Sequence, residues 1–383
     1  MGVSLNLASF YEYNMNTNRE TADKLSFAKK PDKDGVWDVA IIGSGPAGLT
    51  AAVYTTRGAA STLILAGENW GGQLTLTTTV DNYPGFPEGI QGPELMNSMK
   101  RQVERFGAEF VQKNVESVSF TNDPKEIIAG GINYLAKTVI IASGADTKWL
   151  EVPGEDKLRG RGVSSCAPCD APFFKGKRIA VVGGGDSAME EALVLTKYAS
   201  SVIMIHRRDE FKASAAMQSK VMRMRGQGKI NIVWSSEVVE MIGEEKLEKV
   251  VLKSKLETEQ AKLLKEGKTD TLQFKIIEEK EGYLFWEIHL DGLFVAIGHI
   301  PATEMFKNIL DLDERGYIVK TPTKHNQDVN EKDHYHAKTS IPGVFVAGDV
   351  HDHVYRQAIT AAGFGCMAGM DALRYLDKAT PSW

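Results

Sequence analysis

A strand, a glycine-rich turn and a helix follow one another in the segment VWDVAIIGSGPAGLTAAVYTTRG, and this order constrains the fold more than any other feature. An apolar strand at residues 36–42 runs into Gly43, Gly45 and Gly48, and a segment rich in alanine comes next. The first glycine permits a tight turn, the second lets a pyrophosphate approach the backbone, and the third lets the helix pack closely against the strand. The segment therefore predicts a dinucleotide-binding unit.

A second unit of the same kind begins at KRIAVVGGGDSAMEEALVLTKYASSVIMI. Its strand covers residues 179–182, and Gly183, Gly185 and Ala188 occupy the three turn positions, with alanine as an accepted variant at the third. Two complete strand–turn–helix contexts in one chain are much stronger evidence than a lone glycine motif. We therefore expect an α/β fold with two Rossmann-like, three-layer ββα dinucleotide-binding domains.

The residues that follow the second strand of each unit differ in charge. In the first unit STLILAG is followed by Glu68, an acid placed to accept a hydrogen bond from a ribose hydroxyl. In the second unit SVIMI is followed by a basic cluster that fits a 2′-phosphate: His206, Arg207, Arg208 and Lys212. The first site is thus expected to bind FAD and the second NADPH, which predicts a flavoprotein reductase.

Two of the three cysteines are separated by two residues in SSCAPCDAPFF, as Cys166 and Cys169, with Asp170 directly after them. Such a pair is half of a zinc site, a pair of packed thiols or a redox dithiol, and zinc needs a second ligand pair that is not evident nearby. We therefore expect no metal and a disulfide that opens and closes. Asp170 is either a turn cap or the acid and base of the thiol steps, and its adjacency to Cys169 favours the second role.

Composition excludes several classes of protein. The net charge of −5 argues against a nucleic acid partner or an anionic membrane surface, and no apolar run reaches the ~18 residues that span a bilayer. Residues 1–35 lack helical periodicity and are expected to be a poorly ordered extension. Glu12, Glu20 and Asp23 disfavour a mitochondrial presequence, so a cytoplasmic protein is expected.

Seven motifs together resemble the low-molecular-weight thioredoxin reductases, from Val36 to Leu376: GSGPAG, GGQL, GRGVSSCAPCD, GGGDSAMEEAL, HRRDEFKAS, GLFVAIG and GVFVAGDVHDHVYRQAITAAGFGCMA. The resemblance implies an FAD domain at residues 36–147 and 292–383 with an NADPH domain, residues 148–291, inserted in it. It also implies a homodimer, thioredoxin as the protein disulfide substrate, and Cys169 against the flavin ring.

The resemblance also implies residues that bind each cofactor, and the charge pattern described above adds Glu68 and His206 to them. Those expected to hold FAD are Gly43, Ser44, Gly45, Pro46, Ala47, Gly48, Glu68, Gly71, Gly72, Gln73, Asp349, Arg356, Gln357 and Ala358. Those expected to hold NADPH are Gly183, Gly185, Asp186, Ser187, His206, Arg207, Arg208 and Lys212.

Three features depart from the family pattern. Many members have arginine where Lys212 stands, so its contact with a phosphate would be a point charge without the guanidinium fork. Ala171 and Pro172 follow the aspartate where glycine is common, and Pro172 is expected to push Ala171 towards an extended conformation. Residues 253–281 form a longer, charged insertion, expected to be a solvated hairpin or helix.

The chain is expected to cross between the domains near residues 143–150 and 290–293, and the resemblance implies that the NADPH domain rotates about these segments. One rival function is the flavoprotein reductase of another small dithiol protein, as in alkyl hydroperoxide reductase. That class adds an N-terminal dithiol domain, whereas residues 1–165 contain no cysteine. Another rival is a flavin-binding redox sensor without turnover, which would not need a complete NADPH site.

Overall fold

The computed structural model describes residues 30–77, 79–269, 272–321 and 335–379. Most of the expected N-terminal extension, residues 1–35, lies outside the described residues. No helix among the described residues combines the length and apolar character needed to cross a membrane.

The chain divides into two compact units, one inserted in the other along the sequence. The first unit contains the chain up to Asp146 and from Pro301 onward, and the second contains Thr147–Ile300. The first crossing falls within the expected range 143–150, but the second lies beyond 290–293. The boundary expected at 291/292 is therefore wrong, because β18 (Gly292–Val295) pairs in parallel with β11 (Arg178–Val182) of the second unit.

The first unit is built on a seven-stranded sheet in the order β5-β2-β1-β8-β7-β6, with β20 also pairing with β8. β1 runs parallel to both β2 and β8, whereas β7 is antiparallel to β8 and β6. The bounds of these strands are Val36–Ile42 for β1, Thr62–Leu65 for β2, Glu109–Val111 for β5, Val115–Ser119 for β6, Lys125–Ala129 for β7, Ile132–Ile141 for β8 and Val344–Val346 for β20.

β1 is apolar along most of its length because both faces of this central strand are buried, as is usual in parallel sheets. Val39 and Ile41 join the core on one face, and Ala40 and Ile42 join the core on the other. This alternation follows from the two-residue period of a strand.

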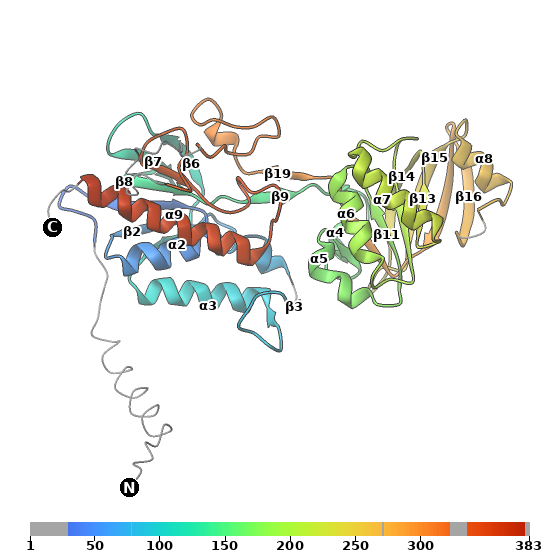
Figure 1. The fold of residues 1–383 in the computed structure, drawn as a ribbon, viewed down its shortest axis with the longest axis horizontal. Helices are drawn as coiled ribbons and strands as arrows, with labels where there is room; N and C mark the ends of the chain where they lie inside the picture. The colour runs from blue at the N-terminus through green and yellow to red at the C-terminus, as the bar shows by residue number, and fades with distance from the viewer. Residues whose placement is uncertain (1–29, 78, 270–271, 322–334, 380–383) are drawn as a thin grey trace, which may run out of the picture. The chain divides into compact units, whose positions relative to one another are not determined.

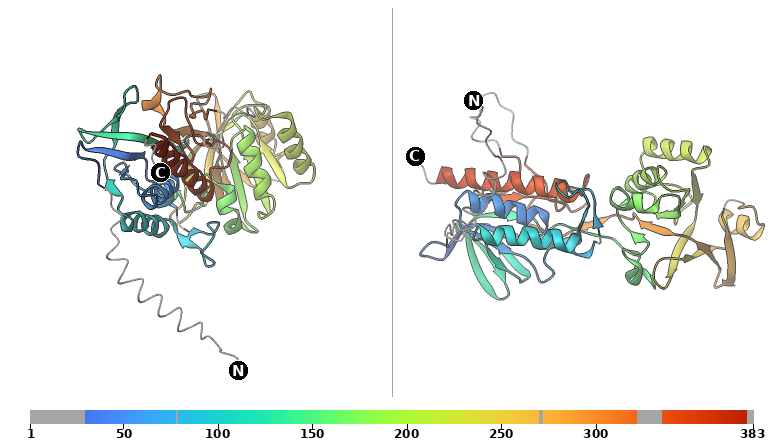
Figure 2. Two further views of the ribbon diagram at one scale, coloured as in Figure 1. Left: turned by 60° about the vertical axis from the view of Figure 1, so that its left-hand side comes forward. Right: turned by 90° about the horizontal axis from the view of Figure 1, so that it is seen from below.

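Three neighbouring helices cover the first of these faces (Figure 1). They are α2 (Pro46–Arg57), α3 (Gly92–Arg105) and α9 (Ala358–Ala379), and they stay side by side in both views of Figure 2. Helix α9 approaches α2 closely, since a Cβ at Gly365 would stand 2.1 Å from the Ala47 carbonyl oxygen. The shorter elements are η1 (Gly72–Leu76), β3 (Thr79–Val80), β4 (Ile90–Gln91) and η3 (Glu304–Phe306), and the crossing strands β9 (Ala145–Thr147) and β19 (His299–Pro301) pair with each other.

The second unit has a parallel five-stranded sheet in the order β10-β18-β11-β12-β13. The other strands are β10 (Val163–Ser164), β12 (Ser201–Ile205) and β13 (Ile230–Val233), and the helices are α4 (Glu155–Leu158), α5 (Ala167–Asp170), η2 (Ala171–Phe174), α6 (Asp186–Leu195) and α7 (Ala215–Gly226). An antiparallel sheet, β14-β15-β17-β16, completes the unit with β14 (Ser236–Ile242), β15 (Lys249–Lys255), α8 (Glu259–Lys265), β16 (Phe274–Lys280) and β17 (Tyr283–His289). The charged stretch 253–281 thus supplies the end of β15, the whole of α8 and the whole of β16. Residues 270–271, between α8 and β16, lie outside the described residues.

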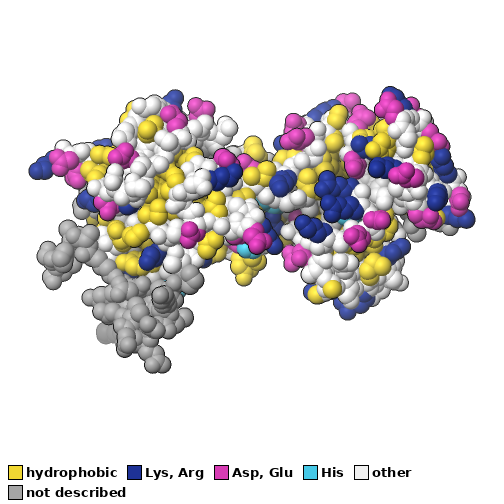
Figure 3. Space-filling model, turned by 90° about the horizontal axis from the view of Figure 1, so that it is seen from above, with side chains coloured by type: hydrophobic (Ala, Val, Ile, Leu, Met, Phe, Trp, Pro, Cys, Tyr) yellow, Lys and Arg dark blue, Asp and Glu magenta, His cyan; other side chains and the backbone are white. Residues whose placement is uncertain are grey.

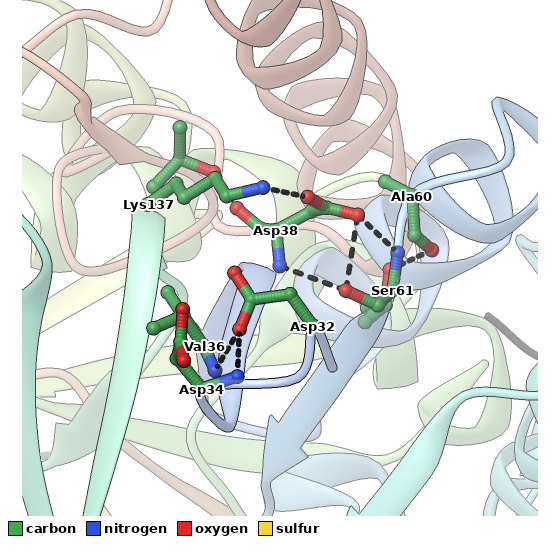
Figure 4. A network of polar contacts seen from close by, with 9 residues as sticks. Asp32, Asp34, Val36, Asp38, Ala60, Ser61 and Lys137 are labelled. Carbon is green, nitrogen blue, oxygen red and sulfur yellow. Dashed lines mark hydrogen bonds and ion pairs between the residues drawn. The ribbon is translucent and has the colours of Figure 1, made fainter. Parts of the chain in front are cut away.

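A polar network ties β1 to its two neighbours (Figure 4). The carboxylate of Asp38 accepts hydrogen bonds from the backbone N–H and hydroxyl of Ser61 at 2.9 and 3.0 Å, and pairs with Lys137 Nζ at 2.8 Å. Burial alone would raise the pKa of Asp38, but the hydrogen bonds from Lys137 and Ser61 outweigh it, and the pKa is lowered. Because the ionised form is favoured in the folded state, this contribution to stability is present above the unfolded pKa and is lost as pH falls through the folded one.

Candidate functional site: two glycine turns and a disulfide

The carboxyl ends of three parallel strands bring predicted residues to one edge of the first sheet. Gly43 follows β1, Glu68 comes soon after β2, and Asp349 comes soon after β20. Ligands of open α/β sheets bind outside this edge. The topology therefore places residues that are distant in sequence beside one candidate binding crevice.

Two glycines of the first turn are required by the chain itself. Gly43 has a φ of +114°, and a Cβ there would stand 2.2 Å from the carbonyl oxygen of Ala142. A Cβ at Gly48 would stand 2.1 Å from the carbonyl oxygen of Gly43. Both glycines thus permit the close packing of turn, strand and helix that the sequence predicted.

The middle glycine of each turn is different, because neither its backbone conformation nor its described neighbours require it. Gly45 has a φ of −70°, Gly185 a φ of −97°, and a Cβ at either would meet no atom of the described residues within 4 Å. At the second turn, by contrast, a Cβ on Gly183 would stand 2.4 Å from the Ala296 carbonyl oxygen. Bare backbone facing open space fits a phosphate that approaches from outside, so both turns fit a dinucleotide.

Ser44 attaches the GGQL segment to the first turn. Its hydroxyl donates to the Ala66 carbonyl oxygen at 2.7 Å and accepts from the Gly71 N–H at 2.9 Å. The next residue, Gly72, lies beside Gly45, since its Cβ would be 3.8 Å from the Gly45 Cα. The side chain of Ser44 therefore organises the predicted site, and GGQL lies next to the open glycine.

Other predicted flavin residues of the first unit form hydrogen bonds with polar neighbours. Gln73 donates to Asp146 Oδ1 at 2.9 Å, and Asn82 donates to Gln357 Oε1 at 3.1 Å. Asn82 belongs to residues 81–87, which line a cavity of about 470 Å³. The sequence prediction missed Asn82, because its pairing with a residue 275 positions away leaves no local signal.

Asp349 has a buried oxygen atom that a ligand could bind. Its Oδ1 is buried and has no hydrogen-bond partner among the residues that the structure describes. Burial raises the pKa of Asp349 to about 7, the neighbouring Asp352 contributes to the increase, and Arg356 opposes both. A buried carboxylate oxygen without a donor fits a ligand hydroxyl, so this position is suited to a flavin side chain.

Asp352, which sequence reasoning missed, shapes the loop before α9. Its carboxylate accepts hydrogen bonds from the backbone N–H groups of Val354, Tyr355 and Arg356 at 2.9–3.0 Å. These bonds hold Arg356 at a φ of +48°, a conformation unusual for a residue with a side chain. Aspartate at the start of a turn was the available signal.

In the second unit the basic cluster separates into two kinds of residue. Arg207, Arg208 and Lys212 are exposed after β12. Lys and Arg side chains also gather on the face of this unit seen in Figure 3. Asp186, at the start of α6, accepts hydrogen bonds from the N–H and hydroxyl of Ser214, both at 2.8 Å, and Ser187 follows it in α6. The loop that carries Lys212 is thereby fastened to the glycine turn.

His206 does not belong to the exposed cations, which corrects the sequence interpretation. Its imidazole is buried against Gly184, where a Cβ would stand 2.2 Å from the ring, and its Nε2 has no partner in the described part of the chain. Burial lowers the pKa of His206, a backbone hydrogen bond with Glu210 opposes this, and the charges of Arg208 and Arg207 lower it further. The side chain is therefore neutral at pH 7 and supports the turn.

Cys166 and Cys169 are joined in a disulfide at the short helix α5. The N–H groups of Cys169 and Asp170 both donate to the Cys166 carbonyl oxygen, at 3.2 and 3.1 Å. Burial raises the pKa of Asp170, and a hydrogen bond from Ser164 partly offsets it. A carboxyl group whose pKa is raised and that follows a disulfide directly in the chain suits proton exchange with sulfur.

Ala171 is helical, with φ −51° and ψ −38°, so the expected extended conformation is wrong. Helix α5 continues directly into η2, and a proline at the start of a helix loses no hydrogen bond. Ala171 is also buried in the core below α6, which favours the compact conformation.

Comparison with known proteins agrees with this arrangement. The family model described as pyridine nucleotide-disulphide oxidoreductase matches residues 37–365. The chain belongs to this family. The chain also resembles the thioredoxin reductase of Streptomyces clavuligerus, with 46% identity over 89% of this chain and 94% of the relative. The thioredoxin reductase of Coxiella burnetii is 42% identical over 88% of this chain and 96% of its own length.

Solved structures extend the likeness to the fold. A thioredoxin reductase from Giardia duodenalis superposes with a TM-score of 0.74 at 38% identity, covering 89% of this chain and 98% of that one. One from Streptococcus pyogenes gives 0.75 at 35% identity, covering 90% and 100%. The predicted α/β fold and the predicted family are thus confirmed, and membership of the family implies the use of a flavin and a pyridine nucleotide.

Replacing Gly45 by alanine should weaken flavin binding by about tenfold or more, because the new methyl group would occupy the open approach to the backbone. The free energy of unfolding of the flavin-free protein should scarcely change, since φ at Gly45 suits alanine and no atom of the described residues is near. Flavin fluorescence titration and urea denaturation measure the two effects.

Gly48→Ala is the matched control for an alanine in the same turn that destabilises the fold, because its Cβ would collide with the backbone. It should lower the free energy of unfolding by about 1–3 kcal/mol. A Gly45→Ala variant that binds flavin like the unmodified protein would contradict the assignment of the open space.

Proposed function

We propose that the protein is a thioredoxin reductase that passes electrons from NADPH through FAD and the Cys166/Cys169 disulfide to the disulfide of thioredoxin. The observation that carries the proposal is this disulfide, which lies in the same unit as the second glycine turn and directly before a half-buried aspartate. The relatives named thioredoxin reductase match this chain over nearly their whole length.

The first unit would hold FAD through the open backbone at Gly45 and Gly72, with Asp349 Oδ1 accepting from a ribityl hydroxyl. Glu68, which is exposed soon after β2, would bind the ribose of the adenosine half. When bound, the flavin would supply the redox chemistry that links hydride transfer from NADPH to the two-electron reduction of a disulfide. Arg356, Gln357 and Ala358 would line the ring side, with Asp352 fixing the backbone of Arg356.

The second unit would hold NADPH through Gly185 and the exposed cations after β12. Arg207 and Arg208 can each form paired hydrogen bonds with a phosphate, whereas Lys212 adds a single ammonium. Neutral His206 would keep the turn in place from beneath. Such a site would select NADPH over NADH because only NADPH has the 2′-phosphate.

Removing both arginines, Arg207→Ala with Arg208→Ala, should raise KM for NADPH by about 10²-fold, because each hydrogen bond to a charged group contributes about 1.5–3 kcal/mol. KM for NADH should change little, since NADH offers the arginines no phosphate at that position. Steady-state kinetics with an aromatic disulfide measures both values.

Lys229→Ala is the control, since Lys229 is an exposed cation that precedes β13, at the amino edge of the same sheet. It should leave both KM values unchanged. An equal loss for NADH and NADPH in the double variant would refute the proposed selection of NADPH.

In the thiol steps Asp170 would hold a proton for the sulfur that leaves and take it back from the thiol that resolves the mixed disulfide. Cys166 and Cys169 would alternate between disulfide and dithiol. A homodimer and a cytoplasmic location are further proposals, and both rest on the resemblance.

Cys166→Ser and Cys169→Ser should each abolish reduction of thioredoxin while flavin reduction by NADPH stays nearly intact, because hydride transfer needs neither sulfur. Asp170→Asn should slow the thiol steps by about 10²-fold without changing cofactor binding. Stopped-flow flavin absorbance and steady-state thioredoxin reduction separate the two half-reactions.

Cys366→Ser is the control, because Cys366 is a free cysteine of α9 in the other unit, and it should behave as the unmodified protein. Either disulfide variant reducing thioredoxin at the unmodified rate would overturn the proposal. A protein that reduces an aromatic disulfide but no thioredoxin would favour a reductase of another dithiol protein, and one without turnover would favour a redox sensor.

A further inference from the structure

The hydroxyl of Ser164, at the end of β10, joins the carboxyl of Asp170 to the backbone of the disulfide. Ser164 Oγ donates to Asp170 Oδ2 at 2.6 Å and accepts from the Cys166 N–H at 3.1 Å. The Asp170 N–H in turn donates to the Cys166 carbonyl oxygen at 3.1 Å. Ser164 is only 8% exposed, so water does not compete freely for its hydroxyl.

These bonds determine which oxygen of Asp170 carries its proton. The Cys166 N–H occupies one lone pair of Ser164 Oγ, and the single hydrogen of the hydroxyl is donated to Oδ2. Oδ2 is then an acceptor in the neutral acid as well as in the carboxylate. While the Ser164 hydroxyl donates to Oδ2, a proton bound to Asp170 resides on Oδ1, the oxygen that Ser164 does not occupy.

Few charges bear on this carboxyl group. Helix α6 packs against α5 and carries Asp186, Glu190 and Glu191, whereas η2 has no titratable side chain. Asp186 is bound to Ser214 and Glu190 is exposed. Burial and the Ser164 hydroxyl are the influences that shift the pKa of Asp170, and they act in opposite directions.

We propose that Ser164 is a positioning residue for the thiol chemistry, whose hydroxyl keeps the transferable proton of Asp170 on Oδ1 and fixes the carboxyl against Cys166. This inference rests on the proposed function, because it gives Ser164 a part in dithiol exchange. Nothing in the sequence marks Ser164, which is one of two serines before the pair.

The proton balance of the exchange shows where Ser164 acts. A thiolate of the reduced pair attacks the disulfide of the partner, one partner sulfur leaves, and that sulfur takes the proton from Asp170 Oδ1. The remaining thiol of the pair then returns a proton to Oδ1 and attacks the mixed disulfide. The Cys166–Cys169 bond forms again, and the second partner sulfur leaves as a thiolate that water protonates. Two electrons pass to the partner, and Asp170 ends as it began.

Ser164→Ala should slow reduction of a disulfide by about tenfold at pH 7 and move the pH limb due to Asp170 upward by about one unit. The upward direction follows because the hydroxyl favours the carboxylate, so its loss makes Asp170 harder to ionise. Flavin reduction by NADPH should not change. The measurement is the pH profile of kcat with thioredoxin and with a small aromatic disulfide, on flavin-loaded protein.

Three companion variants distinguish positioning from a general loss of structure. Ser165→Ala is the matched control, because the Ser165 hydroxyl pairs with Thr147 at 3.3 Å instead of Asp170, and it should keep the original profile. Ser164→Thr retains a hydroxyl and should restore both rate and profile. In an Asp170→Asn background Ser164→Ala should cause no further shift.

The proposal is overturned if the pH profile of kcat does not shift in Ser164→Ala, or if it shifts equally in Ser165→Ala or Ser164→Thr. It is also overturned if Ser164→Ala still shifts the profile in the Asp170→Asn background. Should Ser164→Ala not fold, Ser164→Gly removes the same hydroxyl and is judged by the same criteria. If Asp170→Asn is slow but Ser164→Ala is not, the inference fails while the proposed function stands. If the unmodified protein reduces the aromatic disulfide but not thioredoxin, the proposed function fails, and the aromatic disulfide still tests Ser164.

Discussion

Close contact between backbone segments at the two glycine turns is the constraint on which the rest of this structure depends. A side chain at Gly43, Gly48 or Gly183 would overlap a carbonyl oxygen, so these turns strongly favour glycine at the three positions. Once the turns are closed, each helix begins at the carboxyl edge of its sheet with its first N–H groups facing outward. The open positions Gly45 and Gly185 then lie where a phosphate can reach the backbone.

The same architecture also brings the other site residues together, because the loops that carry them follow neighbouring strands. In the first unit, loops after three parallel strands deliver Gly43, Glu68 and Asp349 to one edge. In the second unit, the disulfide lies just after β10, and Ser164 fixes Asp170 beside it. Each unit thus supplies one part of an electron path from a nucleotide to a disulfide.

Features encoded by a short run of residues could be predicted from the sequence, and features made by distant pairing could not. The glycine turns, the strands before them and the Cys166–Cys169 pair were predicted because their signals are local. Strand β18 was placed in the wrong domain, because its pairing with β11 joins residues more than a hundred positions apart. His206 was assigned to the basic cluster that fits a 2′-phosphate, since a sequence does not reveal that its ring lies under Gly184.

The central claim is that electrons reach Cys166 and Cys169 from NADPH only through the bound flavin. The most direct test is anaerobic thiol alkylation, read by mass spectrometry, on flavin-loaded and flavin-free protein with and without NADPH, with free Cys366 as the internal reference. The account predicts that NADPH makes Cys166 and Cys169 alkylatable in the flavin-loaded protein alone. Equal labelling in the flavin-free protein, or none in the loaded protein with NADPH, would contradict it.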